Sequence, residues 1–380
     1  MHRIAASLVV ASLAACAGED ATERAAYLTL MGNDTLAIEW MEFENDEVRA
    51  QALVRGSETT FSDYHLAFDE TGRVVQYHAR TWQGSDTLGA PVRTQEIRMP
   101  EGGAAQMVTV MADGEENARD LDEVPPSAVP FIDMLHWPFE ASMRWQMDEM
   151  GALQSEVPIL GGRPFPVSEN GDGTWSLRHP SRGPSTMRVD EMGRITMLDG
   201  TGSTRAYDLS RVAFDQLDPM AMLERFGDRP LGELSGRGEI DDEVRGVYFS
   251  GNYGTPMKRG RDIFGGLLAY GVWWRTGANA ATHLSIDGDI VVDGEVIPAG
   301  DYTLSSIPEE DGGILIINRQ TGQGGQSYDE ALDQARVQMR RDMLDETVEV
   351  FEIRAVETDE GGRLELRWDD TVYWVPFTVR

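Results

Sequence analysis

Short runs of alternating apolar and polar residues dominate the first half of the chain. The clearest run is residues 35–43, TLAIEWMEF, and residues 48–55 follow it after a polar turn. Such period-two patterns are typical of β-strands with one buried face. The same pattern predicts further strands at residues 64–68, 74–79, 94–99, 107–111, 174–178 and 185–189. The first half of the chain is therefore predicted to be rich in antiparallel β-structure.

Two of the predicted hairpins share one turn sequence. Residues 69–73 read DETGR and residues 190–194 read DEMGR, and each follows one strand-like run and precedes another. A polar turn with glycine between two apolar runs is a hairpin signal. The repetition predicts a single antiparallel meander that the intervening residues interrupt.

Residues 127–150 have a different period. Their apolar side chains recur at three- and four-residue spacing, which predicts a helix; they are Ile132, Leu135, Phe139, Met143, Met147 and Met150. Pro138 is expected to kink this helix or split it in two. The methionines are interpreted as a core face, with a thioether metal site or an adaptable lipid-facing wall as alternatives. A one-sided sheet packed on a kinked helix resembles the half-barrel lipoprotein carriers of the bacterial envelope.

The second half of the chain is also predicted to be β-rich. A short helix that Asp218 caps and that has Pro219 in its first turn is expected to end near Phe226. Residues 227–239, rich in glycine and proline, are expected to be a linker. Residues 240–380 alternate short strands with Gly/Asp turns, which is typical of an antiparallel β-sandwich. The N-terminal meander or half-barrel with its helical insert is then expected to span residues 27–226.

The net charge of the chain limits the classes of partner that it is expected to bind. The formal net charge is -32 over 380 residues, so binding to nucleic acid and electrostatic docking on anionic headgroups are both disfavoured. Lys258 is the only lysine, and with Arg259 and Arg261 it forms the one basic cluster. That cluster fits either a carboxylate or phosphate ligand or a loop that neutralises neighbouring acids.

The first residues indicate export. Residues 1–15 have a positive start and an apolar run that is too short to span a bilayer, as in a secretory signal peptide. They end in Leu-Ala-Ala before Cys16, the only cysteine, and this segment resembles the bacterial lipoprotein box. The resemblance implies lipidation of Cys16, with residues 16–26 as a lipidated tether. Because Ala17 follows the cysteine, it also implies an outer-membrane location, on the periplasmic face or the cell surface.

Several motifs in the second half resemble one bacterial family. They are GTPMKRGR at residues 254–261, WRTGAN at 274–279, PAGDY at 298–302 and the segment 328–336. Together these motifs are similar to the family catalogued as domain of unknown function 2911, over about residues 245–380. The chain departs from the usual family residues at Thr255, Met257, Trp273 and His283. The resemblance implies a fold and an envelope location, and no chemistry.

Candidate ligand-binding residues follow from these patterns. They are Lys258, Arg259, Arg261, Trp274, Arg275 and Asn279. Arg275 fits an anion or a stack on the neighbouring tryptophan, and it equally fits a structural role beside an acid such as Asp333. Gly277 and Asn279 are typical of a sharp turn with positive φ.

Signatures of catalysis are missing from the sequence. It has no Gly-x-Ser-x-Gly elbow and no His-Glu-x-x-His motif. His65 and His78 flank one hairpin, but a metal pair needs a third ligand, so we expect no metal or cofactor. We therefore expect an envelope lipoprotein with a non-enzymatic binding or structural role. Its N-terminal half is expected to hold a hydrophobic ligand between sheet and helix.

The alternative is a hydrolase that acts on envelope glycan or lipid. Its site would be an unrecognised group around Lys258, Arg275 and Asp333.

Overall fold

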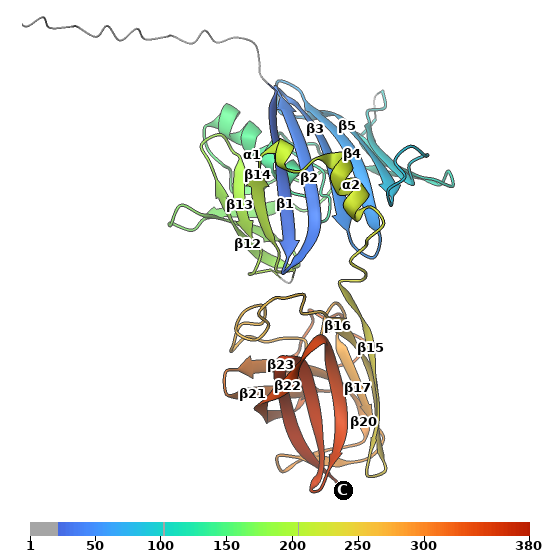
Figure 1. Ribbon diagram of the computed structural model, residues 1–380. Helices are drawn as coiled ribbons and strands as arrows, with labels where there is room; N and C mark the ends of the chain where they lie inside the picture. Colours follow the sequence, from blue (N-terminus) through green and yellow to red (C-terminus); the bar gives the residue numbers. More distant parts are fainter. Residues whose placement is uncertain (1–21, 102, 204) are drawn as a thin grey trace, which may run out of the picture.

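The computed structural model describes residues 22–101, 103–203 and 205–380, which form two antiparallel sheets in series (Figure 1). The predicted mainly β fold class is confirmed. Cys16 and the expected signal peptide, residues 1–15, lie outside the described residues. Among the described residues, no helix combines the length and the apolar character needed to cross a membrane.

The first sheet has 14 strands, in the spatial order β8-β7-β6-β5-β4-β3-β2-β1-β14-β13-β12-β11-β10-β9. The chain runs outward from β1 to β8 and then returns from β9 to β14, so its first and last strands pair at the centre. The strands are β1 (Glu23–Met31), β2 (Asp34–Glu44), β3 (Glu47–Arg55), β4 (Thr59–Phe68), β5 (Val74–Gln83), β6 (Arg93–Arg98), β7 (Gln106–Met111), β8 (Glu116–Asp120), β9 (Glu156–Val157), β10 (Phe165–Glu169), β11 (Trp175–His179), β12 (Gly183–Val189), β13 (Ile195–Asp199) and β14 (Asp208–Val212).

This sheet is buried on both faces at its centre. Along β2, Met41 faces one apolar cluster and Trp40 faces another on the opposite side. Helix α1 (Trp137–Met150) packs on the first face and helix α2 (Pro219–Phe226) on the second (Figure 1). Side chains from both arms of the sheet, β5 and β10, reach the cluster around α1. The face that carries α1 therefore lies between the two arms of the sheet, and it is called the inner face below; the face that carries α2 is the outer face.

Helix α1 begins ten residues later than the apolar spacing predicted. Pro138 lies in its first turn, where the missing N–H group costs no helical hydrogen bond. Residues before Trp137 form no helix. Phe139 and Met143 are 4% and 1% exposed and pack directly on the sheet. The space expected to hold a ligand between sheet and helix is therefore filled by the protein's own side chains.

The two repeated turns both lie in close contact with α1. In each, the aspartate side chain accepts backbone N–H bonds from residues two and four positions later, and the glycine has a φ of +76°. A Cβ at Gly72 would lie 2.3 Å from the Trp145 ring, and one at Gly193 would lie 2.6 Å from backbone atoms of α1. The helix can approach both hairpins this closely only because these positions are glycine.

Helix α2 covers the outer face, and it begins and ends where the sequence predicted. The Asp218 carboxylate accepts the N–H of Ala221 at 2.8 Å, and Pro219 opens the helix. Leu223 is the one fully buried residue of the helix and packs into the outer cluster. A short 3-10 turn, η1 (Phe214–Gln216), joins β14 to this helix.

The second sheet has nine strands, in the order β15-β16-β17-β20-β21-β22-β23-β18-β19. β15 starts at Ser235, inside the segment 227–239 that was expected to be a linker. A second 3-10 turn, η2 (Glu330–Leu332), precedes β22. The strands are β15 (Ser235–Val244), β16 (Val247–Pro256), β17 (Thr282–Ile286), β18 (Ile290–Val292), β19 (Glu295–Ile297), β20 (Gly300–Glu309), β21 (Gly312–Asn318), β22 (Asp333–Thr358) and β23 (Gly361–Val379).

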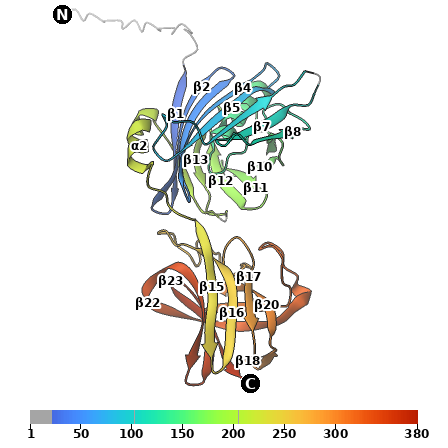
Figure 2. The same ribbon diagram turned by 90° about the vertical axis from the view of Figure 1, so that its right-hand side faces the viewer.

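One long strand makes this sheet fold over on itself. The first part of β22, up to Met339, pairs with β21, and the part from Arg340 onward pairs with β23, with register shifts on either side of Val348. Across the enclosed core, the Ile353 N–H group donates to the Tyr253 hydroxyl at 3.1 Å, and Met257 bridges to Val350. A single apolar cluster fills the interior. The predicted sandwich therefore consists of two layers that share a bent strand, seen from the side in Figure 2.

We predict that Gly193→Ala destabilises the protein more than Gly171→Ala. Both glycines have positive φ, 76° and 81°, so both substitutions carry a similar backbone strain of roughly 1–2 kcal/mol. Only the Cβ at position 193 meets the backbone of α1, whereas a Cβ at 171 meets nothing within 4 Å. Overpacking adds about 1–3 kcal/mol. Urea unfolding measures both variants, and equal losses would show that the turn does not fix the helix.

Candidate functional site

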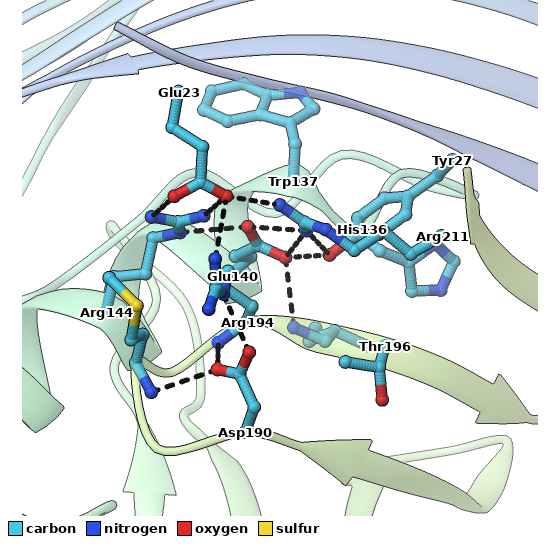
Figure 3. Close-up of polar contacts among 12 residues, drawn as sticks. Glu23, Tyr27, His136, Trp137, Glu140, Arg144, Asp190, Arg194, Thr196 and Arg211 are labelled. Atoms are coloured by element: carbon cyan, nitrogen blue, oxygen red, sulfur yellow. Dashed lines mark hydrogen bonds and ion pairs between the residues drawn. The ribbon is translucent and has the colours of Figure 1, made fainter. Parts of the chain in front are cut away.

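The densest polar cluster lies beneath α1 and centres on a fully buried carboxylate, that of Glu140 (Figure 3). Arg211 donates to both of its oxygens at 2.6 and 2.8 Å, and Arg144 donates at 2.9 Å. The Tyr27 hydroxyl and the Ile195 N–H group complete its shell. A buried charge is tolerated when it is paired and hydrogen-bonded on every side.

Glu23 links the same arginines at the edge of the cluster. Its carboxylate accepts bonds from Arg144 at 2.8 and 3.0 Å and from Arg211 at 2.9 Å, and it lies 3.4 Å from Arg194. Burial raises the Glu23 pKa, but the three arginines outweigh it and hold the pKa below its usual value. Arg194 also pairs with Asp190 at 2.7 Å.

The cluster contains three acids and three arginines, and each of these groups is paired. Its members come from α1, β1, β14 and the hairpin that leads into β13. Burial raises the pKa of the Tyr27 hydroxyl well above its usual value, so this group stays protonated and donates to Glu140. A neutral, saturated cluster of this kind holds the helix in place and leaves no group free for a substrate.

A second buried carboxylate fixes the start of the helix. Glu39 is fully buried and accepts the N–H groups of His136 and Trp137, each at 2.8 Å. The helix N-terminus needs such acceptors and favours negative charge. The Nε2 atom of the His136 ring lies 2.9 Å from the Tyr207 hydroxyl. Burial raises the Tyr207 pKa to about 12, which is the wrong direction for a nucleophile.

An open cavity of about 350 Å³ lies on the inner face, beside Pro130 and Phe131 in the segment that precedes α1. Apolar side chains form its floor, among them Tyr77 and Met107 from one arm of the sheet and Phe165 from the other. The loop before β10 supplies Ile159, Leu160 and the wall of residues 161–163. This volume falls within the usual range of ligand pockets.

The rim of this cavity is cationic and aromatic. Arg119 on β8 and Arg163 before β10 are both exposed and line it. Among the described residues, neither forms an ion pair with an acid. Phe131 is 41% exposed at the lip and packs on Phe165, with the two ring centroids 5.3 Å apart. Burial, and then the nearby Arg182, lower the pKa of His179, the remaining titratable group of the rim.

The basic cluster predicted from the sequence lies where the two sheets meet. Lys258 Nζ donates to Asp369 at 2.6 Å and to the Arg261 carbonyl at 2.8 Å. Arg259 crosses to Asp34 in the first sheet at 3.0 Å, and Arg261 donates to the Arg205 carbonyl at 3.1 Å. These three cations therefore connect parts of the protein to one another.

The Trp-Arg-Thr-Gly-Ala-Asn turn lies at the edge of the second core. Trp274 stacks on Trp368 with ring centroids 6.1 Å apart, and its indole N–H donates to the Gly277 carbonyl. Arg275 donates to the Asn279 carbonyl at 3.0 Å. Asn279 has a φ of 63°, as its position in a sharp turn predicted.

Asp333, suggested as the acid that holds Arg275, bonds elsewhere. Its carboxylate accepts from the Asn318 amide at 2.7 Å and the Tyr328 hydroxyl at 2.8 Å, and it pairs with Arg336 at 3.2 Å. Lys258, Arg275 and Asp333 therefore do not contact one another, although the hydrolase hypothesis grouped them.

The two histidines of the hairpin formed by β4 and β5 lie opposite each other. His65 and His78 are direct cross-strand partners, and His65 lies 3.0 Å from Glu47. Within residues 22–101, 103–203 and 205–380, no group of three His, Cys, Asp or Glu side chains is arranged to hold a metal ion.

Sequence reasoning missed the cavity. Arg119 and Arg163 lie in segments that carry no motif, and only the pairing of strands into one curved sheet brings them to the same rim. The exposed Phe131 could have been suspected, because it stands in an apolar pattern that the helix does not use.

A mostly β protein with two antiparallel sheets is thus the class that the fold defines. Residues 235–377 match the family model described as protein of unknown function (DUF2911), which confirms the resemblance of the C-terminal half. A crystal structure of a DUF1089 family protein from Pseudomonas aeruginosa is 16% identical over 44% of this chain and 91% of that chain, with a TM-score of 0.29. No curated protein matches the chain.

We predict that Glu140→Gln lowers the free energy of unfolding by about 3–5 kcal/mol, because it removes the one fully buried charge of the cluster and leaves Glu23 as the only acid for the partly buried Arg144 and Arg211. The exposed Glu149 on the same helix provides the control Glu149→Gln, which should change stability by less than about 0.5 kcal/mol. Urea unfolding followed by tryptophan fluorescence compares the two. A loss at position 140 no larger than at 149 would contradict the role given to the cluster.

Proposed function

We propose that this protein is an envelope lipoprotein that binds an anionic amphiphile, such as a fatty acid or an acidic lipid, in the cavity on the inner face of the first sheet. The observation that carries the proposal is the combination of an apolar floor with two rim arginines that form no ion pair within the part of the chain that the structure describes. An acyl chain would lie over Met107, Ile159 and Phe165, and its acidic head would meet Arg119 and Arg163.

The electrostatics favour an anion at this place. The chain carries a formal net charge of -32, so acids are abundant. Arg80 and Arg98 on the same sheet, and Arg182 in the turn before β12, each pair with a carboxylate. Arg119 and Arg163 have no such partner among the described residues, so their charge is available to a ligand.

The apolar part of the cavity supports an amphiphile over a small inorganic anion. Ile159, Leu160 and Phe165 are buried in the protein yet line the open space. Covering such surface contributes roughly 25 cal/mol per Å² of apolar area removed from water. Phe131 at the lip is exposed and adds apolar surface that an acyl chain would cover.

The proposed anchor rests on the sequence. Cys16 follows a short apolar leader that ends in Leu-Ala-Ala, which resembles the bacterial lipoprotein box. An anchored binding protein meets membrane lipids continuously, because attachment raises their effective concentration at its pocket.

We expect Arg119→Gln and Arg163→Gln each to weaken binding of a fluorescent long-chain fatty acid about tenfold, because each removes a charge-assisted hydrogen bond. The variants are made in the Cys16→Ser chain, which can be purified without detergent. Arg188→Gln, an exposed arginine away from the cavity, should leave the dissociation constant unchanged.

A long-chain alcohol tests the role of charge. Its affinity should change little in either variant, because it carries no anionic head. If fatty acid does not bind, or binds equally to all variants, the proposal is wrong. Native mass spectrometry of protein purified from its host should also detect a co-purifying amphiphile.

Metabolic labelling with a fatty-acid analogue tests the anchor. We expect label on the wild-type chain and none on Cys16→Ser, because Cys16 provides the only thiol. The control is Ser12→Ala, a change in the leader that keeps the cysteine and should keep the label. Equal labelling of the Cys16→Ser chain would disprove lipidation at this residue.

A further inference from the structure

A groove beside the C-terminal half of α1 is not used by the proposed function. Its volume is about 290 Å³, close to the lower limit of ordinary ligand pockets. The helix forms one wall, and the hairpins β2–β3 and β12–β13 contribute the ends of their strands and their turns. The groove shares no lining residue with the larger cavity on the inner face.

The floor of this groove is aromatic, and its lip carries methionines. Phe43 and Phe68, each 8% exposed, line it from the sheet. Trp145 and Met147 line it from the helix and are half-buried, and Met192 is 53% exposed on the β12–β13 turn. Methionine side chains are flexible and polarisable, so they adapt to varied apolar partners and are frequent on peptide-binding surfaces. The groove therefore offers apolar surface that a partner could cover.

The acids at the edge of the groove determine the charge of its occupant. Asp46, Asp148 and Glu191 line it, and none of them forms an ion pair with the residues that the structure describes. Such acids are common in a chain with a net charge of -32, so they do not mark a site by themselves. Together with the apolar floor, they complement a partner that is both apolar and cationic.

The cation that lines the groove is already neutralised. Arg144 donates to Glu140 at 2.9 Å and to Glu23 at 2.8 and 3.0 Å (Figure 3). Its guanidinium carbon also lies 4.0 Å from the centre of the Phe43 ring, so a ring of the groove already accepts a cation on its face. Arg144 therefore does not offset the acids at the edge.

The end of α1 carries charges of the unfavourable sign. The C-terminus of a helix has a partial negative charge and favours cations. The last turn of α1 has no basic residue, and Asp148 and Glu149 are both exposed there. A local conflict without compensation inside the protein is typical of functional sites. A cationic partner at this end would supply the charge that the helix lacks.

The positions of the acids favour a polypeptide over a small cation. Asp46 lies on the β2–β3 turn, Asp148 on α1 and Glu191 on the β12–β13 turn. The negative charges therefore surround the groove on three separate elements. A single ammonium group would be close to only part of this edge, whereas lysines and arginines on successive turns of a helix can reach several acids at once.

We propose that the groove binds a basic amphipathic segment of a partner protein. One or two apolar side chains of the segment would cover Phe43, Phe68 and Met192, and its lysines or arginines would lie beside the acids at the edge. This arrangement is the helix-in-groove mode of peptide recognition. The site is separate from the cavity on the inner face and does not depend on the ligand proposed there.

Fluorescence anisotropy of a labelled peptide tests the proposal with the Cys16→Ser chain. The probe is a synthetic helix of about 18 residues with leucines on one face and lysines on the other. A scrambled peptide of the same composition has the same charge but no apolar face. We expect the amphipathic peptide to bind about tenfold more tightly than the scrambled one. Equal affinities would show only a general attraction to an acidic protein and would overturn the proposal.

Paired charge variants then locate the contact. Asp148→Asn combined with Glu191→Gln should weaken binding about tenfold, because cations of the peptide lose their partners. The matched control is Glu310→Gln combined with Asp311→Asn, on an exposed turn of the second sheet. It removes the same charge at a distant place and should change the dissociation constant by less than about twofold. Equal weakening by both pairs would contradict binding in the groove.

The apolar contact is tested at the lip. Met192→Gln should weaken binding about threefold, because the substitution removes apolar surface that the peptide covers. Met220→Gln, at a position that is 68% exposed on α2, is the control and should have no effect. If both variants bind as tightly as the parent chain, the peptide does not use the lip of the groove and the proposal is wrong.

A small cationic amphiphile provides the competing outcome. Dodecyltrimethylammonium, kept below its micelle concentration, has an apolar chain and a single charge. We expect it to bind about tenfold more weakly than the peptide, because it can meet only part of the acidic edge. Binding as tight as that of the peptide, and equally sensitive to the Asp148 and Glu191 substitutions, would assign the groove to small amphiphiles and overturn the polypeptide partner.

Discussion

The burial of one carboxylate determines how the first sheet closes. Glu140 cannot lie in the protein interior unless Arg211 on β14, Arg144 on its own helix and Tyr27 on β1 surround it. These partners come from strands at opposite ends of the first sheet's sequence, so the bond pattern forms only when β1 has paired with β14. Closure of the sheet and docking of α1 are therefore one event, since neither leaves the charge satisfied without the other. The repeated hairpins follow from this constraint, because the helix must approach Gly72 and Gly193 closely enough to place Glu140.

The features that depend on neighbouring residues were predictable from the sequence, and the contacts between residues far apart in the chain were not. The two Asp-Glu-x-Gly-Arg turns, the cap at Asp218 and the strand periods depend on neighbours in the chain, and the structure has them where the pattern indicated. The predicted start of α1 was wrong because the apolar spacing continues through residues 127–136. The helix begins at Trp137 instead, where Glu39, 97 positions from His136, accepts the first N–H groups. Likewise, Arg259 resembled a ligand site because its counter-charge, Asp34, is 225 positions away. Arg119 and Arg163 had no local signal, since only strand order makes them neighbours.

The junction between the sheets places second-sheet contacts close to the proposed cavity. Arg261 holds the Arg205 carbonyl, the Arg205 side chain reaches Asp133 at 3.0 Å, and Asp133 also holds Arg182. Arg182 in turn lowers the pKa of His179 on the cavity rim. A series of contacts transmits an effect only where some element has two arrangements of similar free energy. Each of these groups has a partner in the structure, so the contacts tie the residues beside the rim to the second sheet.

The arginines of the cavity rim stand in a strongly acidic protein. The chain has 65 acidic residues against 33 basic ones, and several arginines that stabilise the fold pair with a carboxylate, as Arg211 and Arg259 do. Others bond only to backbone carbonyls, as Arg261 does, so a missing ion pair does not by itself mark a binding site. An acid beside Arg119 and Arg163 would compete with an external anion and repel it. The apolar floor next to these two cations is what favours an amphiphile over a simple anion at this place.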